Sequence, residues 1–328
     1  MELNHESFED LVGAYALDAC EPDEAAAIEE YIATNDEAFA ETERLRAAAA
    51  WLGAGGPLVP PPGLRFTLLT RAGAVVPASG ADAYGALTEG FEAEVAAFPR
   101  DATHTRTQNG LDVRELVAHL DAIDRTFLNE LRAPTSRAFI DAAAVVEITG
   151  EALEQATDSS FDEIVAHWDA TRRDLLDAAA SATDGRTVMG YGVDDALVIR
   201  AFETFTHLDD LRRIQGLPGF VPDASVLRSL ADLSMRVVPY ALAVTGRAHP
   251  GQSARIVLSG PGGRSWDVPL APGEHPSGDP DVTMTVDMLE WCHRFSDRID
   301  AELVAMEVEG DAAVAFDVVA AAPAFTGL

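Results

Sequence analysis

The stretch IRAFETFTHLDDLRRIQG, residues Ile199–Gly216, decides how the rest of the chain is interpreted. Its apolar residues recur at steps of three and four, the spacing of one face of an amphipathic helix; they are Ile199, Phe202, Phe205, Leu208 and Leu211. Glu203 and His207 are set into this pattern four residues apart. Residues at this spacing are neighbours on one helix face. A carboxylate and an imidazole placed in this way are able to bind one divalent metal ion.

A catalytic metal usually has a third protein ligand, which this pair does not provide. The best candidate is His119, which lies beside the apolar stripe of DVRELVAHLDAIDRTFLNEL at residues 112–131. The same residues also fit a simpler arrangement, in which a core histidine is hydrogen-bonded to a carboxylate and no metal is bound. Spacing alone favours this simpler arrangement, because a match to a motif is only a hypothesis.

The charge and the cysteine content of the chain limit its partners. The 328 residues include 55 acidic residues against 23 basic ones, all arginine, and the net charge is −32. Such a surface repels phosphate backbones, so we expect no direct binding to nucleic acid. Only Cys20 and Cys292 occur, without a C-x-x-C pair, which argues against a disulfide framework and a cysteine zinc site. Because we find neither a signal-peptide pattern nor an apolar run of membrane-spanning length, we expect a cytoplasmic protein without membrane contact.

The pattern along the chain predicts a multidomain, mainly α protein with four parts. Residues 1–52 indicate three short helices with 14 acidic and two basic residues, a unit so short that it is expected to need a partner surface. Residues 53–82 begin with GAGGPLVPPP and are expected to be a linker and connector. Residues 83–220 hold four long amphipathic patterns, which predict an antiparallel four-helix bundle. Residues 221–328 include the alternating pattern RIVLS-GPGG-RSWDV and predict a small α+β domain.

The N-terminal part resembles the N-terminal domain of anti-sigma factors. The resemblance rests on LVGAYALDA at residues 11–19, on an acidic second helix and on an alanine-rich third one. Many domains of that family carry a zinc-binding H-x-x-x-C-x-x-C, but this chain has Tyr31, Asn35 and Ala38 at the matching positions. The resemblance therefore implies a zinc-less domain with a sigma factor as partner. The alternative is an acidic helical extension that packs on its own protein or on a second subunit.

A second resemblance covers residues 83–328. VRELVAHL at 113–120, ETFTHLDDLRRIQGLP at 203–218 and VEGDAAVAF at 308–316 together resemble the mycothiol-dependent maleylpyruvate isomerase family. This resemblance implies a DinB-like metal-binding four-helix bundle, followed by a small α+β domain of the sterol-carrier type.

The second resemblance also implies a set of metal ligands. The three ligands of the family map onto His119, Glu203 and His207, and the family's Asp three residues after the last ligand is matched by Asp210. This match favours a bound metal, zinc or another divalent ion, over the simple hydrogen bond. The family usually has Trp where this chain has Leu111, so the packing on the substrate side is expected to differ.

The chemistry implied is that of a zinc ion with three protein ligands and an open fourth position. Such a metal is expected to activate the thiol cofactor mycothiol toward an electrophile, or to polarise a carbonyl or carboxylate substrate. Asp210 would then orient His207 or a cofactor group, or else it is a solvated carboxylate. Weaker cofactor-binding candidates are Arg212, Arg213 and Trp168. Ion pairs with nearby acids explain the two arginines more simply, and packing explains Trp168.

Two functions from different classes remain open. The first is a thiol-dependent metalloenzyme, an isomerase or S-transferase, that acts on a small electrophile or carboxylate. The second is a cytoplasmic regulator, in which residues 1–52 hold a sigma factor and the bundle senses a thiol, a metal or a small ligand. The intact ligand set favours the enzyme, and the fused N-terminal segment favours the regulator. The sequence also allows a homodimer.

Overall fold

The structure is a computed structural model that divides the chain into two compact units. It describes residues 5–17, 19–20, 22–35, 38–46, 75–108, 110–133, 142–183, 185–276 and 278–325. One unit lies within residues 1–65 and the other within residues 66–328. Among the helices described, none is both long enough and apolar enough to cross a membrane.

The N-terminal unit is helical and has a small core of its own. It contains helix α1 (His5–Ala16), helix α2 (Pro22–Ile32) and a further helical segment over residues 38–46. Its buried apolar residues are Phe8, Val12, Tyr15, Ile28 and Ala38. The sequence led us to expect a unit that buries little core and needs a partner surface. The unit does bury a small core of its own, and the partner surface stays a prediction.

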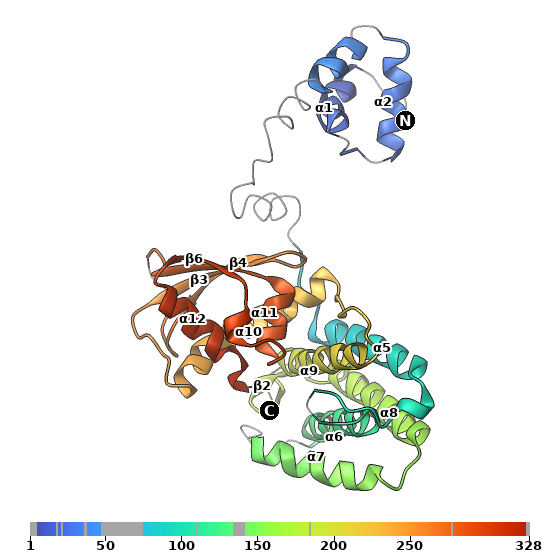
Figure 1. The fold of residues 1–328 in the computed structure, drawn as a ribbon, viewed down its shortest axis with the longest axis vertical. Coiled ribbons are helices and arrows are strands. Elements are labelled where there is room, and N and C mark those ends of the chain that lie inside the picture. The colour runs from blue at the N-terminus through green and yellow to red at the C-terminus, as the bar shows by residue number, and fades with distance from the viewer. Residues whose placement is uncertain are drawn as a thin grey trace. The chain divides into compact units, whose positions relative to one another are not determined.

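Four long helices of the second unit form a bundle. They are α5 (Gly80–Ala97), α6 (Val113–Arg132), α8 (Phe161–Ala180) and α9 (Val193–Ile214). Helix α5 packs along α9 and α6 along α8, while contacts of α5 with α8 and of α6 with α9 close the bundle (Figure 1). An additional helix, α7 (Ala142–Ala156), packs on α6. A two-stranded ladder, β1 (Thr187–Val188) and β2 (Tyr191–Gly192), leads directly into α9.

The starts of these helices follow local capping signals. Capping boxes are present at the starts of α6 and α8; they join Asp112 with Glu115 and Ser160 with Glu163. Helix α5 begins at Gly80, earlier than the expected Ala83, because the side chain of Ser79 accepts a hydrogen bond from a backbone N–H of the first turn. The last part of the expected connector is therefore ordered against the second unit.

The C-terminal part is a four-stranded sheet covered by helices on one face. The sheet order is β4-β3-β5-β6, with β3 and β5 parallel and the other pairs antiparallel. The strands are β3 (Ser253–Ser259), β4 (Arg264–Pro269), β5 (Val282–Asp287) and β6 (Met306–Gly310). The helices are α10 (Ala224–Val244), α11 (Met288–Phe295) and α12 (Ala312–Ala321). The glycine-rich hairpin between β3 and β4 is the one that the sequence predicted.

The buried face of the sheet follows the alternation of side chains along the strands. Ile256 of β3 and Met284 of β5 lie side by side and are both fully buried, while Val257 and Thr285 are half-buried on the opposite face. Helices α10, α11 and α12 pack on the sheet, as Figure 1 shows. The face of the sheet that these helices cover is therefore part of the hydrophobic core.

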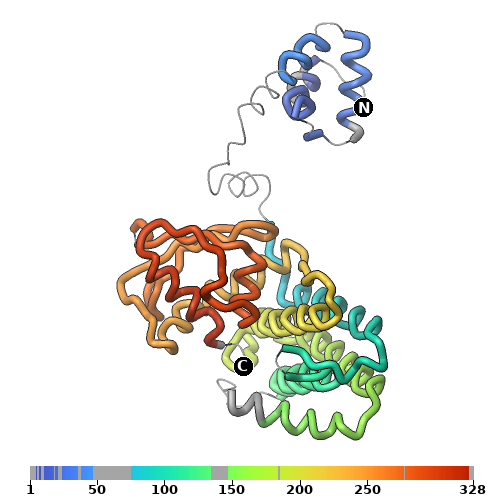
Figure 2. The backbone as a smooth tube through the Cα atoms, in the orientation of Figure 1, coloured from blue at the N-terminus to red at the C-terminus, as the bar shows by residue number. Residues whose placement is uncertain are grey.

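The bundle and the α+β part share one continuous core rather than forming two isolated domains. Helix α10 packs against α5 and α9 of the bundle as well as against β4 (Figure 2). Phe295 of α11 contacts Phe202 of α9, with ring centroids 5.0 Å apart. The C-terminal part therefore lies directly against the helix that carries Glu203 and His207.

Candidate metal centre

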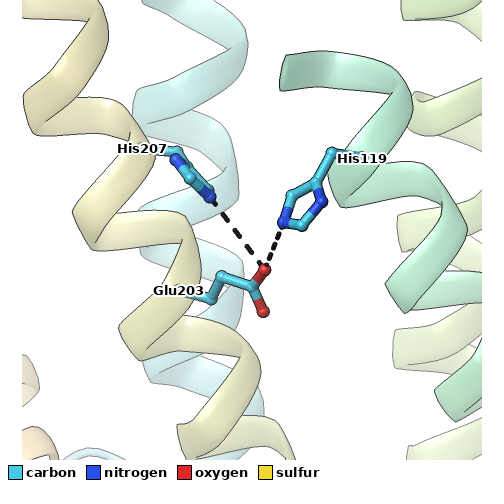
Figure 3. Close-up of side chains that lie close together, drawn as sticks. All are labelled: His119, Glu203 and His207. Atoms are coloured by element: carbon cyan, nitrogen blue, oxygen red, sulfur yellow. Dashed lines mark hydrogen bonds and ion pairs between the residues drawn. The ribbon is translucent and has the colours of Figure 1, made fainter. Parts of the chain in front are cut away.

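Two helices bring the three candidate ligands together. Glu203 and His207 lie one turn apart on α9, and His119 faces them from α6 (Figure 3). Nε2 of His119 is 2.7 Å from Oε1 of Glu203, and Nε2 of His207 is 4.0 Å from the same oxygen. The ligand atoms of the three residues all lie within 4.8 Å of one another. The two imidazole rings stand nearly perpendicular, with an interplanar angle of 86°.

The other carboxylate oxygen of Glu203 is held by a buried arginine. Nη1 of Arg200 donates to Oε2 of Glu203, while Nε of Arg200 donates to Asp124 at 2.8 Å. Trp168 donates its indole N–H to the second oxygen of Asp124 at 3.1 Å. Burial raises the pKa of Glu203, but Arg200 and the two histidines outweigh burial, so the pKa lies well below its ordinary value. Glu203 is therefore a carboxylate at neutral pH.

The orientation of His207 is fixed through Asp210. Nδ1 of His207 lies 3.1 Å from Oδ2 of Asp210, and Arg298 donates to both oxygens of Asp210, each at 2.8 Å. Burial raises the pKa of Asp210, but the hydrogen bonds from His207 and Arg298 lower the pKa to about 2. An ionised carboxylate only accepts hydrogen bonds, so the ring proton of His207 is on Nδ1 and its Nε2 carries a lone pair.

The protonation state of His207 also suits a metal ligand. Burial lowers the pKa of His207 below its ordinary value, and Asp210 offsets only part of this effect. The neutral imidazole is therefore favoured at neutral pH, and the neutral form is the one that binds metals. The hydrogen bond from Nδ1 to a carboxylate is the usual way in which proteins orient such a ligand.

His207 distinguishes a metal centre from a simple hydrogen bond. The contact between His119 and Glu203 has the length of an ordinary hydrogen bond, so this pair alone fits both interpretations. At 4.0 Å, however, Nε2 of His207 is too far from Glu203 for a hydrogen bond. Its lone pair and the carboxylate oxygen face each other in a buried setting, and a cation between them would relieve that repulsion. Two imidazoles and one carboxylate form the donor set of known catalytic zinc sites.

These residues fall inside a stretch that matches a known domain. Residues 84–212 match the family model described as the mycothiol maleylpyruvate isomerase N-terminal domain. His119, Glu203, His207 and Asp210 all lie within the matched residues, whereas Arg298 lies outside them.

The similarity to other proteins extends beyond this stretch. Two uncharacterized proteins of Mycobacterium tuberculosis, from strains CDC 1551 and H37Rv, are each 27% identical over 187 residues, which is 55% of this chain and 72% of the relative. A crystal structure of the mycothiol-dependent maleylpyruvate isomerase is 14% identical, with a TM-score of 0.47, and the match covers 70% of this chain and 91% of that chain. The structure of a mutant of the same enzyme gives a TM-score of 0.48 at the same identity and coverage.

The weaker candidates of the sequence analysis have other partners. Arg212 pairs with Glu94 and Arg213 with Asp209, which are the ion pairs that the sequence offered as the simpler explanation. Trp168 is fully buried and donates to Asp124, so it packs in the core rather than lining a site open to solvent.

The sequence analysis missed Arg200, Asp124 and Arg298. Arg200 precedes Glu203 by three residues on the same helix, and this R-x-x-E spacing was a readable signal for an ion pair. Arg298 is 88 residues away from Asp210 in the chain, and no local pattern could connect the two. The C-terminal part thus contributes Arg298 to the surroundings of the ligands.

We expect the Asp210→Asn variant to be less stable than the wild type by about 2 kcal/mol or more at pH 7, both measured as apoprotein. The folded-state pKa of Asp210, about 2, lies below the ordinary value of about 3.9, so its contribution is present above pH 4 and is lost as the pH falls toward 2. Urea unfolding at pH 7 and at pH 3 measures the difference.

The matched control for this variant is Asp267→Asn, because Asp267 pairs with Arg255 on the exposed face of the sheet. Its removal should change stability little, since exposed ion pairs contribute little. A difference between wild type and Asp210→Asn that is the same at both pH values would contradict the assignment of the low pKa to Asp210.

Proposed function

We propose that this protein is a thiol-dependent metalloenzyme of the mycothiol-dependent isomerase or S-transferase type. The observation that carries the proposal is the convergence of His119, Glu203 and His207 inside a stretch of the isomerase N-terminal domain family. Zinc is the first candidate for the metal, because three ligands of this kind leave a fourth position for a reacting ligand. A divalent ion in this position lowers the pKa of a bound thiol, so that the more nucleophilic thiolate is available.

The side chains of the chain hold and orient the reacting groups. His119, Glu203 and His207 would bind the ion, and Asp210 keeps the proton of His207 on Nδ1. Arg298 fixes Asp210 from the C-terminal part, so the ligand set depends on both parts of the second unit. A thiolate that adds reversibly to an activated double bond converts it to a single bond that can rotate before elimination restores it. We therefore place thiol addition at this centre.

The nucleophilic thiol is proposed to come from a cofactor rather than from the chain. Cys292 is fully buried, and burial raises its pKa well above the ordinary value, so its thiol is a poor nucleophile. Cys20 belongs to the N-terminal unit, and burial followed by the charge of Glu24 raises its pKa as well. Mycothiol is the cofactor that the family relationship suggests.

The charge around the centre favours an anionic ligand or substrate. Glu203 and Asp124 are paired with Arg200, and Asp210 is paired with Arg298. With all three carboxylates ionised and both guanidinium groups charged, these five groups carry a net charge of about −1. A divalent ion changes this to about +1. The loaded centre therefore carries net positive charge, which favours a thiolate or a carboxylate over a neutral ligand. A small electrophile with a carboxylate group is the substrate class that we propose.

The test is an assay in which metal and thiol are varied independently. Zinc-loaded protein with mycothiol should isomerise maleylpyruvate, or couple mycothiol to a bimane electrophile, at least about tenfold faster than protein lacking either component. His207→Ala should reduce the rate to background. The control is His167→Ala, because His167 lies on α8, is largely exposed and pairs with Asp121. A rate that does not depend on mycothiol, or that survives a chelator, would exclude the proposed mechanism.

The regulatory interpretation rests on the N-terminal unit alone. This unit is a separate compact part of the chain, and Leu17 and Phe39 are exposed apolar side chains on it. Exposed single apolar residues are common on protein surfaces and do not identify a partner. Binding of a sigma factor, like the homodimer, stays a prediction. We therefore propose the enzyme as the function of the second unit.

A further inference from the structure

The two oxygens of Glu203 have different neighbours. Oε1 faces the histidines, at 2.7 Å from Nε2 of His119 and 4.0 Å from Nε2 of His207. Oε2 accepts a hydrogen bond from Nη1 of Arg200. The carboxylate therefore has one oxygen directed at the proposed metal position and one oxygen held by a guanidinium group.

Arg200 is itself held in place from several sides. Its side chain is fully buried, and Nε donates to Asp124 at 2.8 Å while the guanidinium carbon lies 5.5 Å from the ring centroid of Phe127. The other oxygen of Asp124 accepts the indole N–H of Trp168. A guanidinium group fixed in this way cannot turn aside to release Oε2 without breaking a buried ion pair.

We propose that Arg200 is a positioning residue that keeps the metal centre open. A free carboxylate can bind a metal ion through one oxygen or through both. If Oε2 of Glu203 also bound the ion, it would add a ligand on the open side, which raises the coordination number and competes with the thiol or substrate for that side. Arg200 prevents this by holding Oε2, so that Glu203 coordinates through Oε1 alone. The inference rests on the metal centre of the proposed function and adds a specific role for a residue that is not a ligand.

A second buried arginine provides the comparison. Arg172 on α8 pairs with Glu92 and Asp169 and lies over the ring of Trp168, in the same bundle. Its side chain is nearly as buried as that of Arg200. Neither Glu92 nor Asp169 is a proposed ligand. Removing Arg172 therefore reports the general cost of losing a buried arginine, whereas removing Arg200 also releases Oε2 of Glu203.

The experiment uses the full chain loaded with cobalt(II), whose visible absorption weakens as the coordination number rises. Arg200→Met leaves Asp124 buried without its partner, so we pair it with Asp124→Asn, which keeps an acceptor for Trp168. In this double variant the visible bands should lose about half of their intensity or more. Titration with 2-mercaptoethanol, followed by the sulfur-to-cobalt charge-transfer band, should show thiol affinity weakened about tenfold or more. Arg172→Met should match the wild type in both measurements.

The possible outcomes separate this inference from the proposed function. A double variant that binds cobalt with the spectrum and thiol affinity of the wild type would overturn the role of Arg200 and leave the metal centre intact. If Arg172→Met shifted the spectrum equally, the effect would come from the loss of a buried arginine, and the inference would fail. A wild-type protein that binds no cobalt would overturn the proposed function, and the role of Arg200 with it.

Discussion

The purified wild-type protein should carry about one divalent metal ion per chain, and the His207→Ala variant should carry close to none. Two ligands on different helices remain in this variant, and two seldom hold a catalytic metal against mild chelation. Elemental analysis after purification without chelator measures the content. Unfolding provides a second measurement, because a metal that binds only the folded state adds about 4 kcal/mol when its concentration is 1,000 times its dissociation constant.

The control is His167→Ala. This histidine is not one of the proposed ligands, and it pairs with Asp121 on the neighbouring helix. The His167→Ala variant should retain the metal. Like the wild type, it should become less stable when a chelator removes that metal. His207→Ala should show no response to chelator. Wild-type protein that contains no metal and does not rebind zinc would refute the centre, and the hydrogen bond between His119 and Glu203 would then be the whole role of that pair.

The helical part of this site was predictable because its information is local. Glu203 and His207 are four residues apart in a clear apolar pattern, and the structure places both on α9. The capping pair before α6 fixed where the helix carrying His119 begins. Bringing His119 opposite Glu203 is a tertiary event across 84 residues, so the sequence could offer His119 only as a candidate third ligand, which the family resemblance then favoured. Metal binding itself stays a prediction.

The surroundings of the ligands were not predictable, because they come from distant parts of the chain. Asp210 was expected either to orient His207 or a cofactor group or to be a solvated carboxylate, and its partner Arg298, which follows α11 in the C-terminal part, was not expected. A charged residue in a loop carries no periodic signal, and 23 arginines offered many equal candidates. Arg298 differs from most of them because its side chain is only 6% exposed and pairs with the buried Asp210. Burial of a loop residue follows from packing between elements and not from local sequence.

The errors about the fold have the same origin. Residues 63–82 gave no clear pattern and were expected to form a partly ordered connector, whereas capping by Ser79 starts α5 at Gly80. The α+β part was described as separate, yet α10 packs against both α9 and the sheet. Local patterns identified the elements, and the contacts between the elements determined the boundaries of the units.

We expect the Trp168→Ala variant to be destabilised by about 3–5 kcal/mol, because its side chain is fully buried in the bundle core. The ring lies edge-on to Phe91, with centroids 5.2 Å apart, and its N–H donates to Asp124. Truncation removes this packing and also takes a hydrogen bond from a buried carboxylate that supports Arg200. Urea unfolding of the apoprotein at pH 7 measures the free energy without a contribution from metal.

Trp168→Phe separates the two contributions. It keeps most of the ring against Phe91 and loses the N–H, so we expect a cost of about 1–3 kcal/mol, the range for leaving a buried acceptor without its donor. The comparison outside the bundle is Trp266→Ala, because Trp266 is only partly buried and its N–H donates to Asp232 on α10. Its loss should cost clearly less than that of Trp168. If Trp168→Ala and Trp266→Ala were equally mild, the contact between Trp168 and Asp124 could not be a structural support of the ligand helix.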